Sequence, residues 1–300
     1  MSVLRASLAD TLRSLLGLGP RTPAPVLVPV RRRLRLAALA VPLALAATAP
    51  LTGCATTGIN RGDLNVVSLD EEWQLGQQID AQVRQQMRIV NDPQLTAYVS
   101  QMGQRIVATT EMANRRWQFH VVQDDAINAF NIPGGHVYVN TGLIAAAGSA
   151  SELAGVVAHE ITHGVSRHGT ERLTKEQGAG AVAGLVLGRD PGLIAQIATQ
   201  VAAGGAFARF SRGDETEADR YGVRYMTAAG YNANGMATMF ERLLAERRSR
   251  PSSVERFFST HPLTTDRIAT VQAEIRKQGG ARGAQNDAGF AAAKARAQRY

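Results

Sequence analysis

The strongest constraint on this chain is a polar motif inside an otherwise apolar helix. His159-Glu160-Ile161-Thr162-His163 lies in the segment 151–165, whose Leu, Val and Ile residues follow helical spacing. Such a helix belongs in a core, where two histidines and a glutamate without partners are costly. Residues four apart share a helix face, so His159 and His163 can bind one zinc ion, with Glu160 beside it as general base. The alternative, two ordinary histidines and an acid, is disfavoured by this pattern.

Zinc requires a third protein ligand, and catalysis requires an open fourth position. The segment 211–219 contains four acids within six residues. Glu215 and Asp219 are four apart on a predicted helix, so one carboxylate can bind the metal while the other accepts the second N–H of a ligand histidine. The acids also suit a helix N-terminus, and both interpretations can hold together. Glu217 is expected to point elsewhere.

These motifs resemble a gluzincin-type zinc peptidase family that contains the CAAX prenyl endopeptidase, HtpX and BepA. The resemblance implies that Glu215 is the third zinc ligand and Asp219 its neighbouring partner. It also implies an α+β fold, mainly α: a zincin-type metalloprotease domain with a small β-sheet whose edge strand lines the active-site cleft. Further matches, within about 68–277, are Asn128-Ala129-Phe130, Pro133-Gly134-Gly135, Thr141-Gly142-Leu143 and Arg167-His168.

The same resemblance implies how substrate binds. An exposed edge strand at Asn128, Ala129 and Phe130 can pair with an extended peptide. An ordinary hairpin over 119–140 is compatible with this. His120 and His136 alternate with apolar neighbours and are interpreted as surface strand residues.

His261 lies where the resemblance places a histidine that fills the open zinc position and inhibits the enzyme. The equal alternative is an extended residue before Pro262, ahead of a helix capped by Thr264 or Thr265. His168 is interpreted as structural. The candidates for an oxyanion donor are Tyr221, His261 and Arg267.

Hydrophobic periodicity predicts the remaining organisation. Helices are expected over 68–87, from Asp92-Pro93 onward, and over 151–165, 214–229, 233–246 and 264–277, with strands at 117–122 and 136–140. The apolar stretch 178–206 contains two runs too short for a membrane span, which predicts helices that cover a site or pack in the core.

The first 53 residues predict export and lipidation. Four arginines between 31 and 35 precede an uncharged run, 36–52, and Leu51-Thr52-Gly53-Cys54 resembles a bacterial lipobox. An uncleaved membrane anchor is the alternative. The predicted parts are a leader (1–53), a linker (54–67), the peptidase domain (68–278) and a low-complexity tail (279–300) that is loosely held or a short basic helix.

Charge and cysteine content exclude other classes. Seven arginines and one acid of the total 33 basic and 25 acidic residues lie in 1–53, which leaves 26 basic and 24 acidic residues, a net charge of +2, downstream. This disfavours nucleic-acid binding. Cys54 is the only cysteine, so disulfides are excluded. The uncharged Ala55 favours the outer membrane, by resemblance to lipoprotein sorting.

The sequence thus predicts a lipid-anchored periplasmic zinc endopeptidase at the outer membrane. It would hydrolyse misfolded or unassembled envelope proteins by a zinc-activated water, with one zinc per chain and Glu160 as general base. Expected partners are extended or unfolded polypeptides, the membrane through Cys54, and the outer-membrane assembly machinery. The alternatives are an outer-membrane assembly chaperone with little or self-inhibited proteolysis, and a non-peptidase zinc hydrolase.

Overall fold

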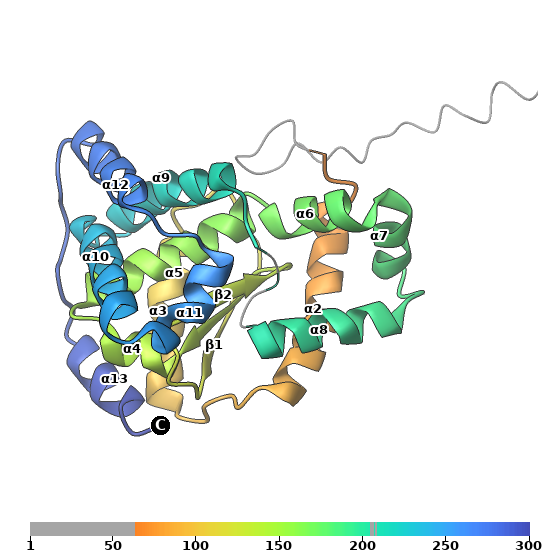
Figure 1. Ribbon diagram of the computed structural model, residues 1–300, viewed down its shortest axis with the longest axis horizontal. Coiled ribbons are helices and arrows are strands. Elements are labelled where there is room, and N and C mark those ends of the chain that lie inside the picture. The colour runs from red at the N-terminus through yellow and green to blue at the C-terminus, as the bar shows by residue number, and fades with distance from the viewer. Residues whose placement is uncertain (1–63, 205–206, 208) are drawn as a thin grey trace, which may run out of the picture. The chain divides into compact units, whose positions relative to one another are not determined.

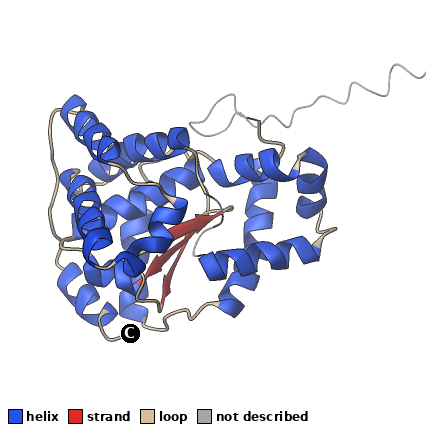
Figure 2. Ribbon diagram, viewed as in Figure 1, coloured by secondary structure: helices blue, strands red, loops and turns tan. Residues whose placement is uncertain are grey.

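The computed structural model describes residues 64–204, 207 and 209–300, which form helices around a small sheet (Figures 1 and 2). The predicted leader, Cys54 and most of the predicted linker lie outside the described residues. The elements are α2 (Leu69–Gln86), α3 (Pro93–Val107), β1 (Gln118–Val122), β2 (Ala129–Ile132), β3 (His136–Asn140), α4 (Thr141–Ala146), α5 (Ala150–Val165), α6 (His168–Gln177), α7 (Ala179–Val186), α8 (Pro191–Gly204), α9 (Arg212–Ala228), α10 (Asn234–Ser249), α11 (Pro251–Thr260), α12 (Thr265–Lys277) and α13 (Phe290–Ala297). The α+β, mainly α, class is confirmed.

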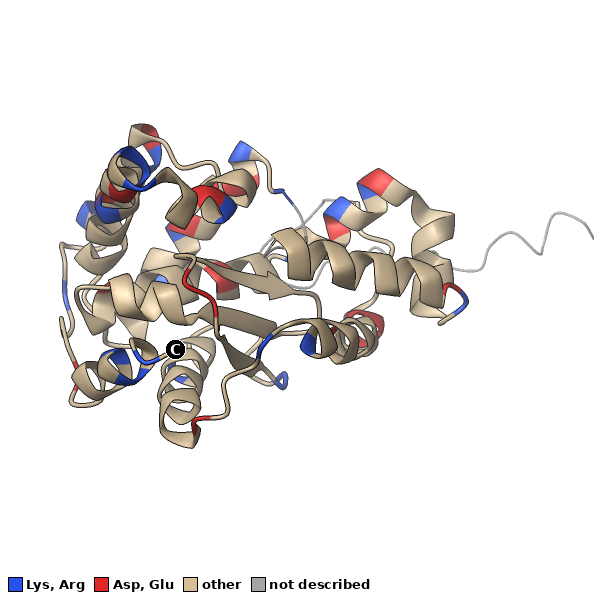
Figure 3. Ribbon diagram, turned by 60° about the horizontal axis from the view of Figure 1, so that its bottom comes forward, with Lys and Arg blue, Asp and Glu red and all other residues tan. Residues whose placement is uncertain are grey.

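The sheet has the strand order β1-β3-β2. β2 and β3 form an antiparallel hairpin, whose turn contains Gly134 and Gly135 with φ values of 79° and 76°. β1 runs parallel to β3 on its other side, with His120 opposite Tyr138. A hairpin was expected over 119–140, but only β2 and β3 form one. No strand carries a charged Lys, Arg, Asp or Glu, and such residues lie on the helices and loops (Figure 3).

α5 lies at the centre of the larger hydrophobic core. All 16 of its residues are buried, and it packs against α3, α9, α10 and β2. Glycine permits the close approach of α10: a Cβ at Gly155 would lie 2.7 Å from the Met236 Cα, and one at Gly235 would lie 2.3 Å from the Ser151 backbone. The polar motif of α5 is therefore held deep inside the domain.

A second core lies on the other face of the sheet, between the strands and α2, α7 and α8. α7 and α8 account for the apolar stretch 178–206, and their buried faces pack on α2, as expected for core-packing helices (Figure 1). Within the described residues, no single helix is long and apolar enough to cross a membrane. α7 and α8 reach that length and apolarity only together, across a 96° bend.

The helix starts follow the local capping signals. Ser68 and Glu71 form the predicted capping box of α2, and Asp92 caps α3 before its Pro93. Ser211 and Asp214 form a second capping box, which begins α9. The short helices α6 and α11 were not predicted.

Both ends of the described domain extend beyond the predicted boundaries. The segment 279–300 is not a loose tail, because Phe290, Ala293 and Ala297 of α13 are buried and α13 packs against α3 and α4. Within this segment, α13 is a short helix. At the other end, Asn65 and Val67 are buried, so the predicted linker ends earlier than residue 67.

Candidate metal centre and active site

α5 presents its two histidines on one face. The Nε2 atoms of His159 and His163 lie 3.1 Å apart, and both side chains are fully buried. Glu160 is equally buried, and neither of its carboxylate oxygens accepts a hydrogen bond of normal geometry among the described residues. Burial raises the pKa of Glu160, against the attraction of His261 and His159.

α9 brings both predicted carboxylates to these histidines. Glu215 Oε1 lies 3.4 Å from His163 Nε2, and Glu215 Oε2 lies 3.6 Å from His159 Nε2. One turn later, Asp219 Oδ1 lies 3.0 Å from His159 Nδ1. The two acids therefore take different positions, with Glu215 beside the metal-facing nitrogens and Asp219 at the second nitrogen of His159.

His261 follows α11 and reaches the same centre. Its Nδ1 atom lies 2.9 Å from Glu215 Oε1 and 3.3 Å from His159 Nε2, while its Nε2 atom lies 3.4 Å from Glu160 Oε1. Its backbone is non-helical before Pro262. His261 can therefore be both an extended residue before Pro262 and a histidine at the open zinc position. Burial alone would lower the pKa of His261, but Glu160 and Glu215 outweigh it and raise the pKa.

The four side chains fit a tetrahedral zinc ion. Zinc bonds of about 2.0–2.2 Å place neighbouring ligand atoms about 3.3–3.6 Å apart. Three of the five separations above lie in this range, and the His159–His163 and His261–Glu215 separations are shorter, at 3.1 and 2.9 Å. Burial holds the pKa of His163 well below its ordinary value and favours the neutral ligand form. Burial alone would raise the pKa of Glu215, but His261 and Arg267 hold it well below its usual range. Glu215 is therefore ionised, and three imidazoles with one carboxylate form a donor set that zinc accepts.

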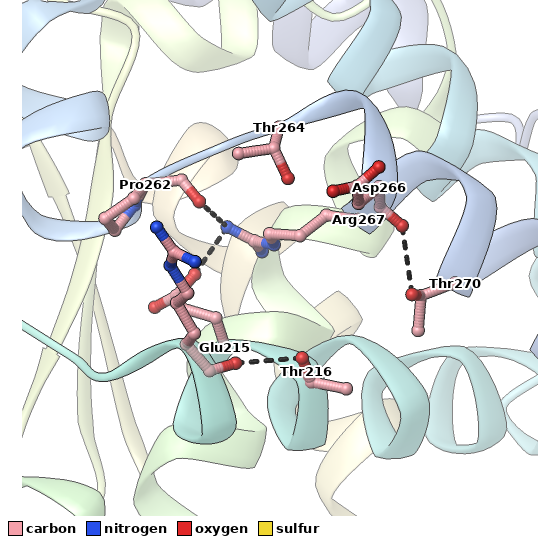
Figure 4. Close-up of a pocket in the computed structure, with 8 residues that line it drawn as sticks. Glu215, Thr216, Pro262, Thr264, Asp266, Arg267 and Thr270 are labelled. Atoms are coloured by element: carbon pink, nitrogen blue, oxygen red, sulfur yellow. Dashed lines mark hydrogen bonds and ion pairs between the residues drawn. The ribbon is translucent and has the colours of Figure 1, made fainter.

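Arg267 of α12 contacts the carboxylates of both Asp219 and Glu215. Its Nε and Nη2 atoms donate to the two oxygens of Asp219, each at 2.7 Å. Its Nη1 atom lies 2.5 Å from Glu215 Oε2 and donates to the carbonyl oxygen of Pro262 at 3.3 Å (Figure 4). With its three nitrogens engaged in this way, Arg267 is a positioning residue, and the geometry does not favour it as an oxyanion donor.

A cavity of about 280 Å³ adjoins this ion-pair network. Glu215, Thr216, Pro262 and Arg267 line it, between the start of α9 and the segment leading into α12 (Figure 4). Because Glu215 is both a cavity wall and a candidate ligand, the cavity reaches the back of the metal centre. Tyr221, another of the oxyanion candidates, packs against Tyr225 and Arg224 instead.

His168 contacts His163, a contact that the sequence analysis did not predict. Arg167, between α5 and α6, has a left-handed conformation with φ 62° and turns the chain, so that His168 begins α6 beside the metal centre. The Nδ1 atoms of His168 and His163 lie 2.8 Å apart. Glu217 contacts the far side of His168 at 3.6 Å, away from the ligand atoms. His168 is therefore an outer partner of His163.

β2 is an edge strand beside the metal centre, as the resemblance implied. The Asn131 backbone faces the Glu160 carboxylate and lowers its pKa. However, Asn128-Ala129-Phe130, expected to be exposed, is fully buried, and Phe130 packs in the second core. β2 thus lies at the sheet edge beside the metal centre, as expected, but residues 128–130 are buried and not exposed.

The interpretation of His120 and His136 as surface residues is wrong. His136 is 1% exposed and His120 9%, because both lie beneath α2, where they contact Asp80. Strand alternation alone did not reveal which face a helix would cover.

Comparison with known proteins agrees with this geometry. Residues 93–275 match the model of Peptidase family M48. The chain is 33% identical over 225 residues to a putative beta-barrel assembly-enhancing protease of Vibrio cholerae, covering 71% of this chain and 46% of that protein. It is 31% identical over 216 residues to the beta-barrel assembly-enhancing protease of Escherichia coli K12, with coverages of 68% and 44%. It is also 33% identical over 219 residues to the mitochondrial metalloendopeptidase OMA1 of Schizosaccharomyces pombe, with coverages of 71% and 64%. The chain thus spans about half the length of the two bacterial relatives. On the family match and these identities, the chain belongs to peptidase family M48.

Proposed function

We propose that this chain is a zinc-dependent endopeptidase in which Glu160 is the general base. The observation that carries the proposal is a fully buried Glu160 carboxylate, which accepts no hydrogen bond of normal geometry among the described residues, beside the converging side chains of His159, His163 and Glu215. A zinc ion held by these three ligands supplies a Lewis acid for water and for the peptide carbonyl.

The protein's own residues supply proton transfer and orientation. Glu160 accepts a proton from the attacking water and returns it to the leaving amine, a cycle favoured by a carboxyl pKa raised by burial. Asp219 accepts the Nδ1–H of His159, which directs the Nε2 lone pair toward the metal. Arg267 pairs with both Asp219 and Glu215, so these acids stay ionised and fixed in position.

Metal dependence and internal cleavage test this function. The purified full chain should cleave casein, lose this activity in a chelator and regain it with zinc. New N-termini inside the casein sequence would identify an endopeptidase. Cleavage that persists after complete removal of zinc would contradict the proposal, and hydrolysis of small esters alone would favour a non-peptidase hydrolase.

A self-inhibited state is supported by His261. Its ring lies between the ligand atoms and Glu160, where water and a peptide carbonyl must bind. His159, Glu160, His163, Glu215 and His261 are each at most 1% exposed. Cleavage therefore requires His261 and the segment that carries it to move aside.

His261→Ala tests the self-inhibited state. Casein cleavage should rise several-fold while the zinc content stays the same, because the three ligands fixed on α5 and α9 remain, whereas His261 lies on the segment that must move aside. Unchanged or lower cleavage at full zinc content would contradict inhibition by His261.

The proposed substrates are extended polypeptides, specifically misfolded or unassembled envelope proteins. The names of the Vibrio and Escherichia relatives, which are beta-barrel assembly-enhancing proteases, support a role in beta-barrel assembly. The leader 1–53 and Cys54 support a periplasmic protein with a lipid anchor in the outer membrane. Mass spectrometry of the mature N-terminus tests this, since a diacylated Cys54 is expected and an unmodified residue there would contradict it.

An assembly chaperone with little proteolysis is the second candidate, and the enclosed metal centre favours it. Rescue of a strain that lacks the gene distinguishes the chaperone from the peptidase. A Glu160→Gln protein that still restores envelope integrity would favour the chaperone. Loss of rescue would favour the peptidase.

A further inference from the structure

A second cluster of metal-ligating side chains lies on the opposite face of the sheet from α5. It consists of Asp80 from α2, His120 from β1 and His136 from β3. Strand side chains alternate between faces, so His136 and Tyr138 face the second core, whereas Val137 faces the core of α5. The cluster shares no residue with the active site.

The three candidate ligand atoms form a nearly equilateral triangle. Asp80 Oδ1 lies 3.2 Å from His120 Nε2 and 3.3 Å from His136 Nδ1, and the two nitrogens are 3.4 Å apart. Zinc bonds of about 2.0–2.1 Å give tetrahedral edges of about 3.3–3.4 Å. One ion can therefore contact all three atoms.

Protons alone crowd this triangle, because Asp80 would accept hydrogen bonds from both imidazoles and from Tyr138. Each ring nitrogen carries at most one hydrogen, so if both imidazoles donate to Asp80, their N–H groups oppose each other across 3.4 Å. If His120 donates to His136 instead, the accepting nitrogen presents a lone pair to the Asp80 carboxylate. Tyr138 already donates to the same oxygen, Asp80 Oδ1. A cation removes this conflict because it accepts all three lone pairs.

Helix docking and ring packing hold the cluster in place. Gly76, one turn before Asp80, lies so close to the β2–β3 turn that a Cβ would be 2.2 Å from the Pro133 carbonyl oxygen. The His120 ring stacks on Tyr138 with centroids 4.6 Å apart. The Asp80 and His120 side chains each keep 10% exposure, so the cluster is not fully enclosed.

We propose that Asp80, His120 and His136 bind a second zinc ion, with water as the fourth ligand. Two imidazoles and one carboxylate form a donor set for borderline divalent cations, and zinc takes it in tetrahedral geometry. Tyr138 orients the ligating carboxylate through its hydroxyl. The ion connects α2 to β1 and β3 and acts as a structural clamp.

Zinc stoichiometry of the full chain tests this site. Protein saturated with zinc and dialysed against zinc-free buffer should hold two ions per chain by elemental mass spectrometry. His163→Ala should hold one, and His163→Ala combined with Asp80→Asn should hold none. Asp70→Asn is the matched control, because it makes the same change at an exposed position of α2 and should leave two ions.

The outcomes separate this site from the active centre. One ion in the wild type that disappears in His163→Ala would overturn the second site and leave the proposed function intact. One ion that survives His163→Ala but disappears in Asp80→Asn would support the second site and contradict the active-site zinc.

A cobalt titration avoids any change to the cluster. The His163→Ala protein should bind one Co²⁺ per chain with the visible absorption of a four-coordinate site, and zinc should displace it. Failure to bind cobalt saturably would overturn the proposal. His136→Leu in the same background should abolish the absorption, and an unchanged spectrum would also overturn it.

Discussion

The two histidine–carboxylate clusters are built on different secondary structure. In the active centre, His159 and His163 are four apart on α5, and Glu215 and Asp219 are four apart on α9. The second cluster takes one ligand from each of a helix and two strands that are distant in sequence. The six histidines of the chain all belong to these clusters or, like His168, contact one. Ligand spacing on a helix is therefore visible in a sequence, whereas ligands assembled by strand pairing are hidden.

The clusters also differ in what surrounds the ligands. Glu160 stands next to the active-centre ligands with no normal hydrogen bond among the described residues, so it is available for proton transfer. In the second cluster the only carboxylate is Asp80, and it already contacts Tyr138 and both histidines. The active centre therefore has a carboxylate, Glu160, that is available for proton transfer, and the second cluster has none.

Removing a ligand of the active centre should give the largest effect. His163→Ala is expected to lower casein cleavage by more than about 10³-fold, because the metal contributes several kcal/mol to transition-state stabilisation. His136→Leu, the corresponding change in the second cluster, should keep most of the activity of the folded protein. Equal losses in the two variants at full folding, measured by circular dichroism, would break the distinction between the clusters.

Removing the carboxylate that contacts a ligand histidine should have an intermediate effect. Asp219→Asn weakens the acceptor for His159 and disturbs the pairing with Arg267, so zinc affinity at the active centre should fall about 10–100-fold. Competition with a chromogenic chelator measures this affinity, with Asp70→Asn as the control. An unchanged affinity would show that Asp219 does not support the ligand.

Crowding the contact between α2 and the sheet should give the smallest effect. Gly76→Ala inserts a methyl group against Pro133 and is expected to cost about 1–3 kcal/mol of unfolding free energy. Gly180→Ala in α7 is the matched control, because a Cβ there meets nothing within 4 Å, and it should be neutral or slightly stabilising. Chemical denaturation measures both. Equal stabilities would contradict the close docking that assembles the second cluster.

Much of the active centre was predictable because its determinants are local. The HExxH spacing, the acids four apart and the capping residues Ser68 and Ser211 each act within one or two helical turns. The resemblance to a known family added Glu215 as the metal-binding acid and the position of His261.

The rest depends on long-range packing that periodicity does not contain. His136 looks like a surface residue in its strand, but α2 covers that face of the sheet. The left-handed Arg167, which turns His168 toward His163, has no glycine to signal it. The segment 279–300 is rich in Ala and Gly, yet α13 packs against α3 and α4 with Phe290 buried.

The central claim, that Glu160 is the general base of a zinc peptidase, is tested most directly by Glu160→Gln in the His261→Ala background. The parent variant is expected to be uninhibited, so a loss of activity is measurable against a high rate. Casein cleavage and zinc content are measured on the same preparations. The account predicts unchanged zinc and a cleavage rate lower by about 10²–10⁴-fold. A double variant that keeps its zinc and cleaves casein as fast as His261→Ala would contradict it.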